Sequence, residues 1–178
     1  IDIKTYIFQR LFHTYQMDYS IASATGLFNI FNLDWDKQAL EVAGITRNQL
    51  PELVEPTDQI TGLDPIYSQV TGIGTEVPFI FGASDGVLSN LGVNAIDPGV
   101  LAVTIGTSGA VRVVVDHPVV DPNGRLFCYV LTKDKWVVGG PVNNGGIIFR
   151  WVRDQLFAPE KLTAEQMRVS TYDILTQI

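Results

Sequence analysis

Two apolar runs separated by four small residues stand out in the second half of the chain. The runs are Val100–Ile105 and Ala110–Val115, and Gly106-Thr107-Ser108-Gly109 lies between them. Valine and isoleucine favour strands, and glycine permits the backbone angles of a tight turn. The pattern therefore predicts a β-hairpin.

More strands and a helix are expected after this hairpin. Leu126–Leu131 and Lys135–Val138 are two further strand candidates, and the apolar residues that follow Gly145-Gly146 recur at the three-and-four spacing of a helix. This succession predicts a mixed α/β layer domain that starts near Pro98. The length of 178 residues fits one domain or two half-domains equally well.

A separate core is expected in the first half of the chain. Ile3–Tyr15 has the apolar stripe of an amphipathic helix, and Asp36–Val42 has an acidic cap and a closing Gly44. Pro51–Gly74 is dense in proline and glycine and predicts a connector. Val77–Phe81 predicts a strand that leads into a helix between Ser84 and Ala95.

Charge and composition exclude several classes of function. Twelve Lys and Arg against 19 Asp and Glu give a net charge of −7, without the basic run that nucleic acid or an anionic membrane surface requires. The single cysteine, Cys128, lies in an apolar stretch and predicts a buried structural thiol. No apolar run is long enough to span a membrane, so we expect a cytoplasmic protein. The chain begins inside a helical pattern without Met, so we expect it to extend upstream.

Glycine-bearing junctions are the candidate sites, and each has a structural alternative. Gly106-Thr107-Ser108-Gly109 is either a plain hairpin turn or a phosphate loop, and Gly145-Gly146 provides either close packing or ligand contact. Asp85 either caps the helix that follows it or carries chemistry. The histidines, His13 and His117, lack metal-ligand spacing.

The order of these segments resembles one enzyme family. Asp18–Phe28, Gly82-Ala83-Ser84-Asp85-Gly86, Gly99–Gly109 and Gly145-Gly146 ahead of Arg150–Asp154 are similar in sequence and spacing to the FGGY family of carbohydrate kinases. The resemblance covers about Lys4 to Leu156 and is greatest to the bacterial gluconate kinases.

The resemblance implies an α/β chain of the actin-like ATPase, ribonuclease-H-like fold. Residues 1–97 would form the end of the N-terminal, substrate-side domain, and residues 98–178 the start of the C-terminal, nucleotide-side domain. The implied activity is ATP-dependent phosphorylation of a sugar acid, gluconate to 6-phosphogluconate, with Mg²⁺. Xylulose or another sugar or polyol is the alternative acceptor, and a homodimer is an open expectation. A non-catalytic actin-like ATP-binding module is the rival of another class.

The resemblance also assigns roles to individual residues. Asp85 would be the catalytic base and would contact the substrate together with Ser84. The nucleotide would be contacted by Gly106, Thr107, Ser108, Gly146 and Arg150. Arg150 stands where some relatives carry glutamine, so a salt-bridged helix face is its alternative role. The family's metal-binding Asp-x-Gly-Thr loop and its adenosine-binding glycines lie outside this chain, so no metal ligand is expected within it.

Overall fold

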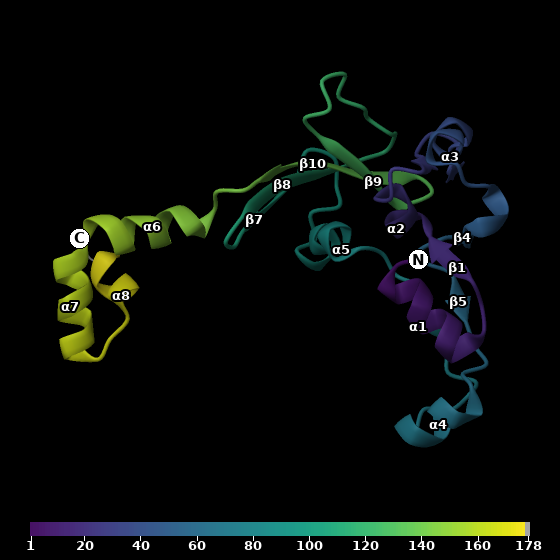
Figure 1. Cartoon of the computed structure of the whole chain (residues 1–178), viewed down its shortest axis with the longest axis horizontal. Helices are drawn as coiled ribbons and strands as arrows, with labels where there is room; N and C mark the ends of the chain where they lie inside the picture. Colours follow the sequence, from purple (N-terminus) through teal and green to yellow (C-terminus); the bar gives the residue numbers. More distant parts are fainter. Residues whose placement is uncertain (177–178) are drawn as a thin grey trace. The chain divides into compact units, whose positions relative to one another are not determined.

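The computed structural model describes residues 1–176 and contains both helices and strands (Figure 1). The chain divides into two compact units. Unit 1 comprises Ile1–Ala102 and Arg112–Gly139, and unit 2 comprises Val103–Val111 and the residues from Gly140 onward. The predicted domain boundary between residues 97 and 98 remains a prediction.

The first part of unit 1 combines short helices with two-stranded sheets. Its helices are α1 (Ile3–Phe12), α2 (Tyr19–Ser23), α3 (Lys37–Ala43), the single 3-10 turn Arg47–Gln49, α4 (Pro65–Thr71) and α5 (Asp85–Gly92). Its strands are β1 (Gln16–Asp18), β2 (Phe28–Asn29), β3 (Asp34–Trp35), β4 (Glu52–Val54), β5 (Gln59–Ile60) and β6 (Phe79–Ile80). β1 and β4 pair in parallel, whereas β2–β3 and β5–β6 are antiparallel.

One of these helices begins and ends where the sequence predicts, and another is shorter than predicted. Asp36 caps α3, with its Oδ1 accepting from Ala39 N at 2.9 Å, and Gly44 ends the helix with a φ of 67°. α1 is shorter than predicted, because His13 adopts a left-handed φ of 55° and closes the helix through its bond to Gln9 O. The predicted connector Pro51–Gly74 is wrong in three places, since it contains β4, β5 and the helix α4, which is capped by Asp64.

A first core packs α2 and α3 around β1 and β3. Met17, Ala22, Trp35 and Leu40 are its buried members, and partly buried residues such as Leu27 and Leu53 close it. The indole Nε1 of Trp35 donates to Pro51 O at 3.1 Å, so the polar atom of this buried ring is satisfied. The N-terminal half therefore has the core of its own that the sequence predicts.

A four-stranded sheet follows, in the order β7 (Leu101–Ile105), β8 (Gly109–Val115), β10 (Lys135–Val142) and β9 (Phe127–Thr132). The predicted hairpin and both further strands are confirmed within one or two residues at most ends. In unit 1, Val87 of α5 packs against Val114, Leu131 and Val137 of this sheet, and all four side chains are buried. Cys128 lies on β9 and is only partly buried, whereas the sequence predicts a buried thiol. Its partial burial raises the pKa of the thiol, which favours a structural role over a reactive one.

Unit 2 contains the turn of the hairpin and three C-terminal helices. These are α6 (Gly146–Leu156), α7 (Ala158–Met167) and α8 (Thr171–Leu175). Phe149 of α6 packs on the ring of Tyr172 at a centroid distance of 5.3 Å, and the Arg153 guanidinium lies 5.0 Å from the same ring. Among residues 1–176, no helix has the length and hydrophobicity needed to cross a bilayer.

Candidate active site

Asp85 is the first residue of α5 and its side chain is exposed. Ser84 is the N-cap residue of α5, and Asp85 lies in the first turn. Asp85 is therefore not the capping residue that the structural alternative predicted. Asp85 Oδ1 nevertheless accepts from Gly86 N at 2.7 Å, and the helix N-terminus favours its negative charge. The side chain thus has the exposure that a proton acceptor needs.

The backbone around Asp85 is held from two sides. Val87, two residues further, is fully buried in the core between α5 and the sheet. Before α5, Phe81 is buried and stacks on Phe8 of α1 with ring centroids 4.6 Å apart. Gly82 N donates to Pro56 O at 2.8 Å. Asp85 is therefore an exposed residue within an anchored stretch.

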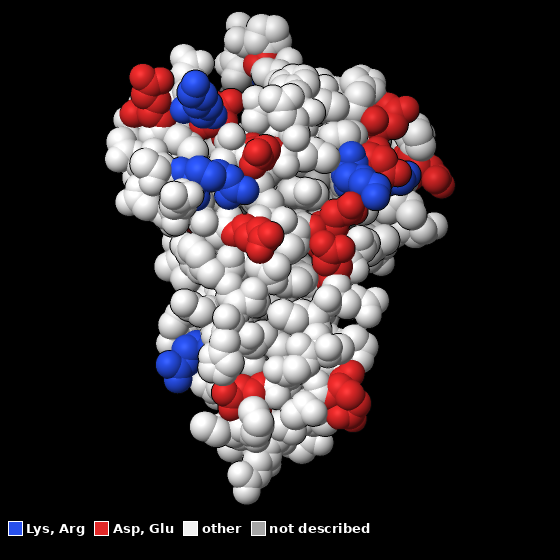
Figure 2. All heavy atoms as spheres, turned by 90° about the vertical axis from the view of Figure 1, so that its right-hand side faces the viewer, with Lys and Arg blue, Asp and Glu red and all other residues white. Residues whose placement is uncertain are grey.

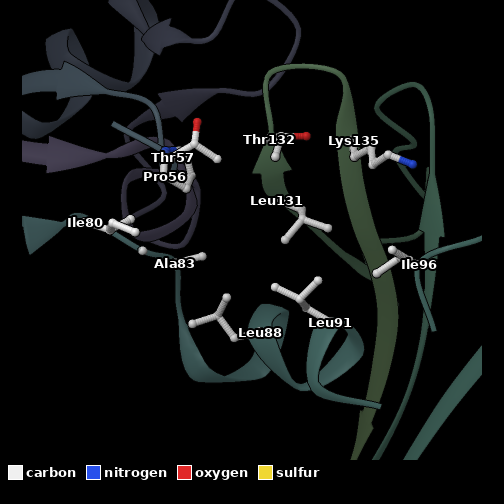
Figure 3. A pocket seen from close by; sticks show the side chains of 11 residues that line it. Pro56, Thr57, Ile80, Ala83, Leu88, Leu91, Ile96, Leu131, Thr132 and Lys135 are labelled. Carbon is white, nitrogen blue, oxygen red and sulfur yellow. The ribbon is translucent and has the colours of Figure 1, made fainter. Parts of the chain in front are cut away.

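An apolar cavity of about 340 Å³ lies beside this stretch, and Gly82 and Ala83 are among the residues that line it. Figure 3 shows Leu88 and Leu91 of α5 pointing toward Leu131 of β9 across it, with Pro56 and Ile80 beside them. A sugar acid carries a hydroxyl on nearly every carbon, and each would lose its hydrogen bonds to water among these side chains. The cavity does not suit such a substrate, and it is not part of the candidate site.

The predicted phosphate loop is the turn between β7 and β8, and it belongs to unit 2. Gly106, Thr107 and Ser108 are all exposed. Gly106 N donates to Ser108 O at 2.7 Å, which tightens the turn. The Thr107 and Ser108 hydroxyls and the exposed backbone suit an approaching phosphate group, so the residues present fit this part of ATP.

The glycine pair before α6 packs directly on this turn. Gly145 N and Ile147 N donate to Thr107 O at 3.0 and 3.3 Å, and Gly146 N donates to Gly106 O at 2.7 Å. A Cβ on Gly145 would lie only 2.6 Å from Ser108 O. The structure thus shows the close packing of Gly145-Gly146, and it brings Gly146 and Gly106 together. These three amides already donate to carbonyl groups of the turn. The hydrogen bonds to a bound phosphate would therefore be donated by the turn itself.

Arg150 lies on α6, and its side chain is 65% exposed. Its Nε is 3.8 Å from Asp154 Oδ2, one turn along the helix. Asp154 is also 2.7 Å from Arg153 Nη2, so Arg150 is the outer member of a surface charge cluster. The salt-bridged helix face is therefore present, and a nucleotide contact by Arg150 remains a prediction.

Charged side chains elsewhere on the described surface are mixed in sign. Figure 2 shows one face on which most basic side chains lie beside acidic ones. Two ion pairs of unit 1 are Lys133–Glu55, at 3.1 Å, and Arg47–Asp34, at 3.6 Å. Among residues 1–176, no group of three or more His, Cys, Asp or Glu side chains is placed to hold a metal ion.

Comparison with known proteins identifies the family. Residues 1–92 match the family described as FGGY family of carbohydrate kinases, N-terminal domain. The chain is 54% identical to a gluconokinase of Bacillus subtilis (strain 168) over its whole length, which covers 35% of that protein. It therefore spans about a third of this curated relative.

Solved structures give the same result. A ligand-bound xylulose kinase from Lactobacillus acidophilus superposes with a TM-score of 0.87 at 41% identity, covering 98% of this chain and 34% of that one. A gluconate kinase from the same organism superposes with a TM-score of 0.85 at 44% identity, covering 88% and 32%. The predicted fold class is confirmed, and the chain belongs to the FGGY family of carbohydrate kinases.

Proposed function

We propose that the protein containing this chain transfers the γ-phosphoryl group of ATP to a hydroxyl of a sugar acid, converting gluconate to 6-phosphogluconate. Asp85 acts as the general base. The observation that carries the proposal is the exposed carboxylate of Asp85 at the start of α5, on a backbone anchored on both sides. The 54% identity to a gluconokinase supports gluconate as the acceptor.

In phosphoryl transfer the protein mainly positions the reactants and stabilises charge. The acceptor hydroxyl gives its proton to the Asp85 carboxylate while its oxygen forms a bond to the γ-phosphorus, and the bond from that phosphorus to the ADP oxygen breaks. An ionised carboxylate within hydrogen-bond reach of the hydroxyl is sufficient for the proton transfer. Ser84, adjacent to Asp85, is the proposed second contact of the substrate.

The nucleotide contacts are proposed on unit 2. The turn Gly106-Thr107-Ser108 would hold the β- and γ-phosphates, and Gly146 and Arg150 would lie nearer the rest of the nucleotide. Mg²⁺, which neutralises phosphate charge in such reactions, would be bound by the phosphates and by residues beyond this chain. No described cluster of this chain fits the ion.

Xylulose is the second candidate acceptor, because a xylulose kinase superposes as well as a gluconate kinase does. The test is release of ADP by the full-length protein with gluconate, xylulose, ribulose, glycerol and fuculose. We expect the highest kcat/KM with gluconate. A higher value with xylulose would move the assignment to that sugar. Release of ADP no faster than without acceptor would favour the non-catalytic ATP-binding module.

A further inference from the structure

The loop that leads into α5 is held by polar side chains from α1 and α2. Lys4 Nζ of α1 donates to Gly82 O at 3.3 Å, and Ser84 N donates to Ser20 Oγ of α2 at 3.1 Å. The two Ser hydroxyl oxygens are 3.4 Å apart. Both ends of the three-residue loop 82–84 are therefore fixed by residues that lie far from it in sequence.

The first of these anchors depends on a buried ion pair. Asp18 is fully buried, and its Oδ2 lies 2.5 Å from Lys4 Nζ. Its Oδ1 accepts from Ile21 N at 3.0 Å and caps α2, the helix that carries Ser20. Burial raises the pKa of Asp18, and the Lys4 ammonium opposes that shift. One carboxylate thus orients both Lys4 and α2.

A buried ion pair contributes little to the free energy of unfolding. Removing two charges from water offsets most of the attraction between them, and apolar replacements of buried pairs are often neutral or stabilising. A buried pair does, however, fix geometry, because each partner accepts only a narrow range of positions. Because Lys4 of this pair bonds Gly82 O, we infer that the pair fixes the position of the loop 82–84.

Ser84 transmits this geometry to Asp85. Ser84 is the N-cap of α5, yet its hydroxyl makes no bond to the helix amides and faces Ser20 instead. Ser20 is fully buried, and its carbonyl accepts from Ser23 Oγ at 2.7 Å, which in turn accepts from Val130 N of β9 at 3.1 Å. The Ala83–Ser84 peptide, which carries the Ser84 N–H, is thereby tied to α2, and α2 is tied to the sheet.

We propose that Ser20 and the Lys4–Asp18 pair are positioning residues, which fix the loop 82–84 so that the Asp85 carboxylate points at the acceptor hydroxyl. This inference rests on the proposed function of Asp85. In this proposal the side chains of Lys4, Asp18 and Ser20 do not contact the substrate. They act through the backbone of Gly82 and Ser84, where a shift of about 1 Å can cost about 100-fold in rate.

The test uses the full-length protein with Ser20→Ala and Lys4→Met, and Ser68→Ala as the matched control. Ser68 of α4 donates from its Oγ to Ile73 O at 2.6 Å, a bond that closes the end of α4 and does not involve the loop 82–84. We expect kcat to fall at least about tenfold in the first two variants, with the KM for ATP within about twofold, because only a transition-state contact is disturbed. Ser68→Ala should keep the wild-type kcat.

A double-mutant cycle separates positioning from a structural loss. In an Asp85→Asn background, where residual turnover is followed with radiolabelled ATP, Ser20→Ala should lower kcat by less than about twofold, since its target is already gone. An undiminished effect in that background, or a wild-type kcat in Ser20→Ala, overturns the inference. If the Lys4→Met variant does not fold, the double variant Lys4→Met, Asp18→Asn is measured instead, because it removes both charges of the pair.

Failure of the proposed function has a different signature. In that case Asp85→Asn alone keeps the wild-type kcat, and the positioning role falls with it. If Asp85→Asn is strongly impaired while Ser20→Ala and the Lys4 variants are normal, the proposed function stands and only the positioning role is wrong.

Discussion

Asp85 is exposed, whereas Phe81 and Val87 on either side of it are buried. An exposed side chain usually has many conformations, and a fixed backbone removes most of the freedom that would carry its carboxylate away from a substrate. Carboxylates that cap helices need no such fixation. The combination of exposure and anchoring supports the role that we propose for Asp85.

Hydrogen bonds from nearby residues set the pKa of Asp121. The Arg125 side chain donates to it from Nε at 2.8 Å and from Nη2 at 2.9 Å, and these bonds together with Arg125 N lower its pKa to about 2. The pKa of Asp121 in the folded protein lies below the ordinary aspartate value of 3.8, so any stabilisation is present above about pH 4 and is lost as pH falls toward 2.

Replacing the guanidinium tests this assignment. We predict that Arg125→Gln raises the pKa of Asp121 toward its ordinary value without reaching it, because the backbone N–H of residue 125, which donates to the carboxylate at 2.7 Å, is kept. A ¹³C NMR titration of the Asp carboxyl groups measures it. An unchanged midpoint near 2 in the variant would mean that backbone donors alone set this pKa.

At this scale the sequence predicted Asp85 but not the residues that support it. Asp85 lies in a short segment with a recognisable pattern. Lys4 and Ser20, in contrast, meet the loop across 78 and 64 residues of chain. Single polar contacts over such distances leave no periodic signal, and only the folded chain reveals them. The roles of Thr107, Gly146 and Arg150 in nucleotide binding remain predictions.

At the scale of elements, the contact between the hairpin turn and α6 is the most demanding one in unit 2. Gly145 allows two backbone segments to approach until Ser108 O and Gly106 O lie 2.6 and 2.8 Å from where a Cβ would stand. Any side chain must push the turn away from the helix. The three bonds from the amides of Gly145, Gly146 and Ile147 depend on that approach.

We predict that Gly145→Ala loosens this contact. Overpacking of this kind costs about 1–3 kcal/mol, so amide exchange in residues 145–148 should be at least about fivefold faster. Hydrogen exchange with mass spectrometry measures it. Gly92→Ala on α5 is the control, because a Cβ there would meet nothing within 4 Å. Unchanged exchange in Gly145→Ala would show that the turn yields without cost.

Elements with strong local signals were predicted and those with weak or conflicting signals were not. The hairpin follows from β-branched runs around a glycine turn, and α3 from Asp36 and Gly44. α4 also has its signals, with Asp64 as cap, Pro65 in the first turn and Gly72 at the end, but the surrounding proline and glycine favoured a connector. α2 has five residues, too few to show a helical period.

At the scale of the whole molecule, the chain represents about a third of each protein it resembles, with shares of 35%, 34% and 32%. Leu101, Val103 and Ile105 of β7 are 60%, 60% and 72% exposed. A strand that is almost entirely apolar, as β7 is apart from Thr104, is typical of sheets covered on both faces. Its exposure here fits a segment of a larger fold, so activity is to be measured on the full-length protein.

The direct test of the proposed base is Asp85→Asn in the full-length protein, measured as kcat with gluconate together with ATP binding by calorimetry. The amide keeps the size of the side chain but accepts no proton. We predict a fall in kcat of about 100- to 10,000-fold, the range typical of a lost general base, with ATP affinity within about twofold of wild type. A kcat near the wild-type value would contradict the assignment of Asp85.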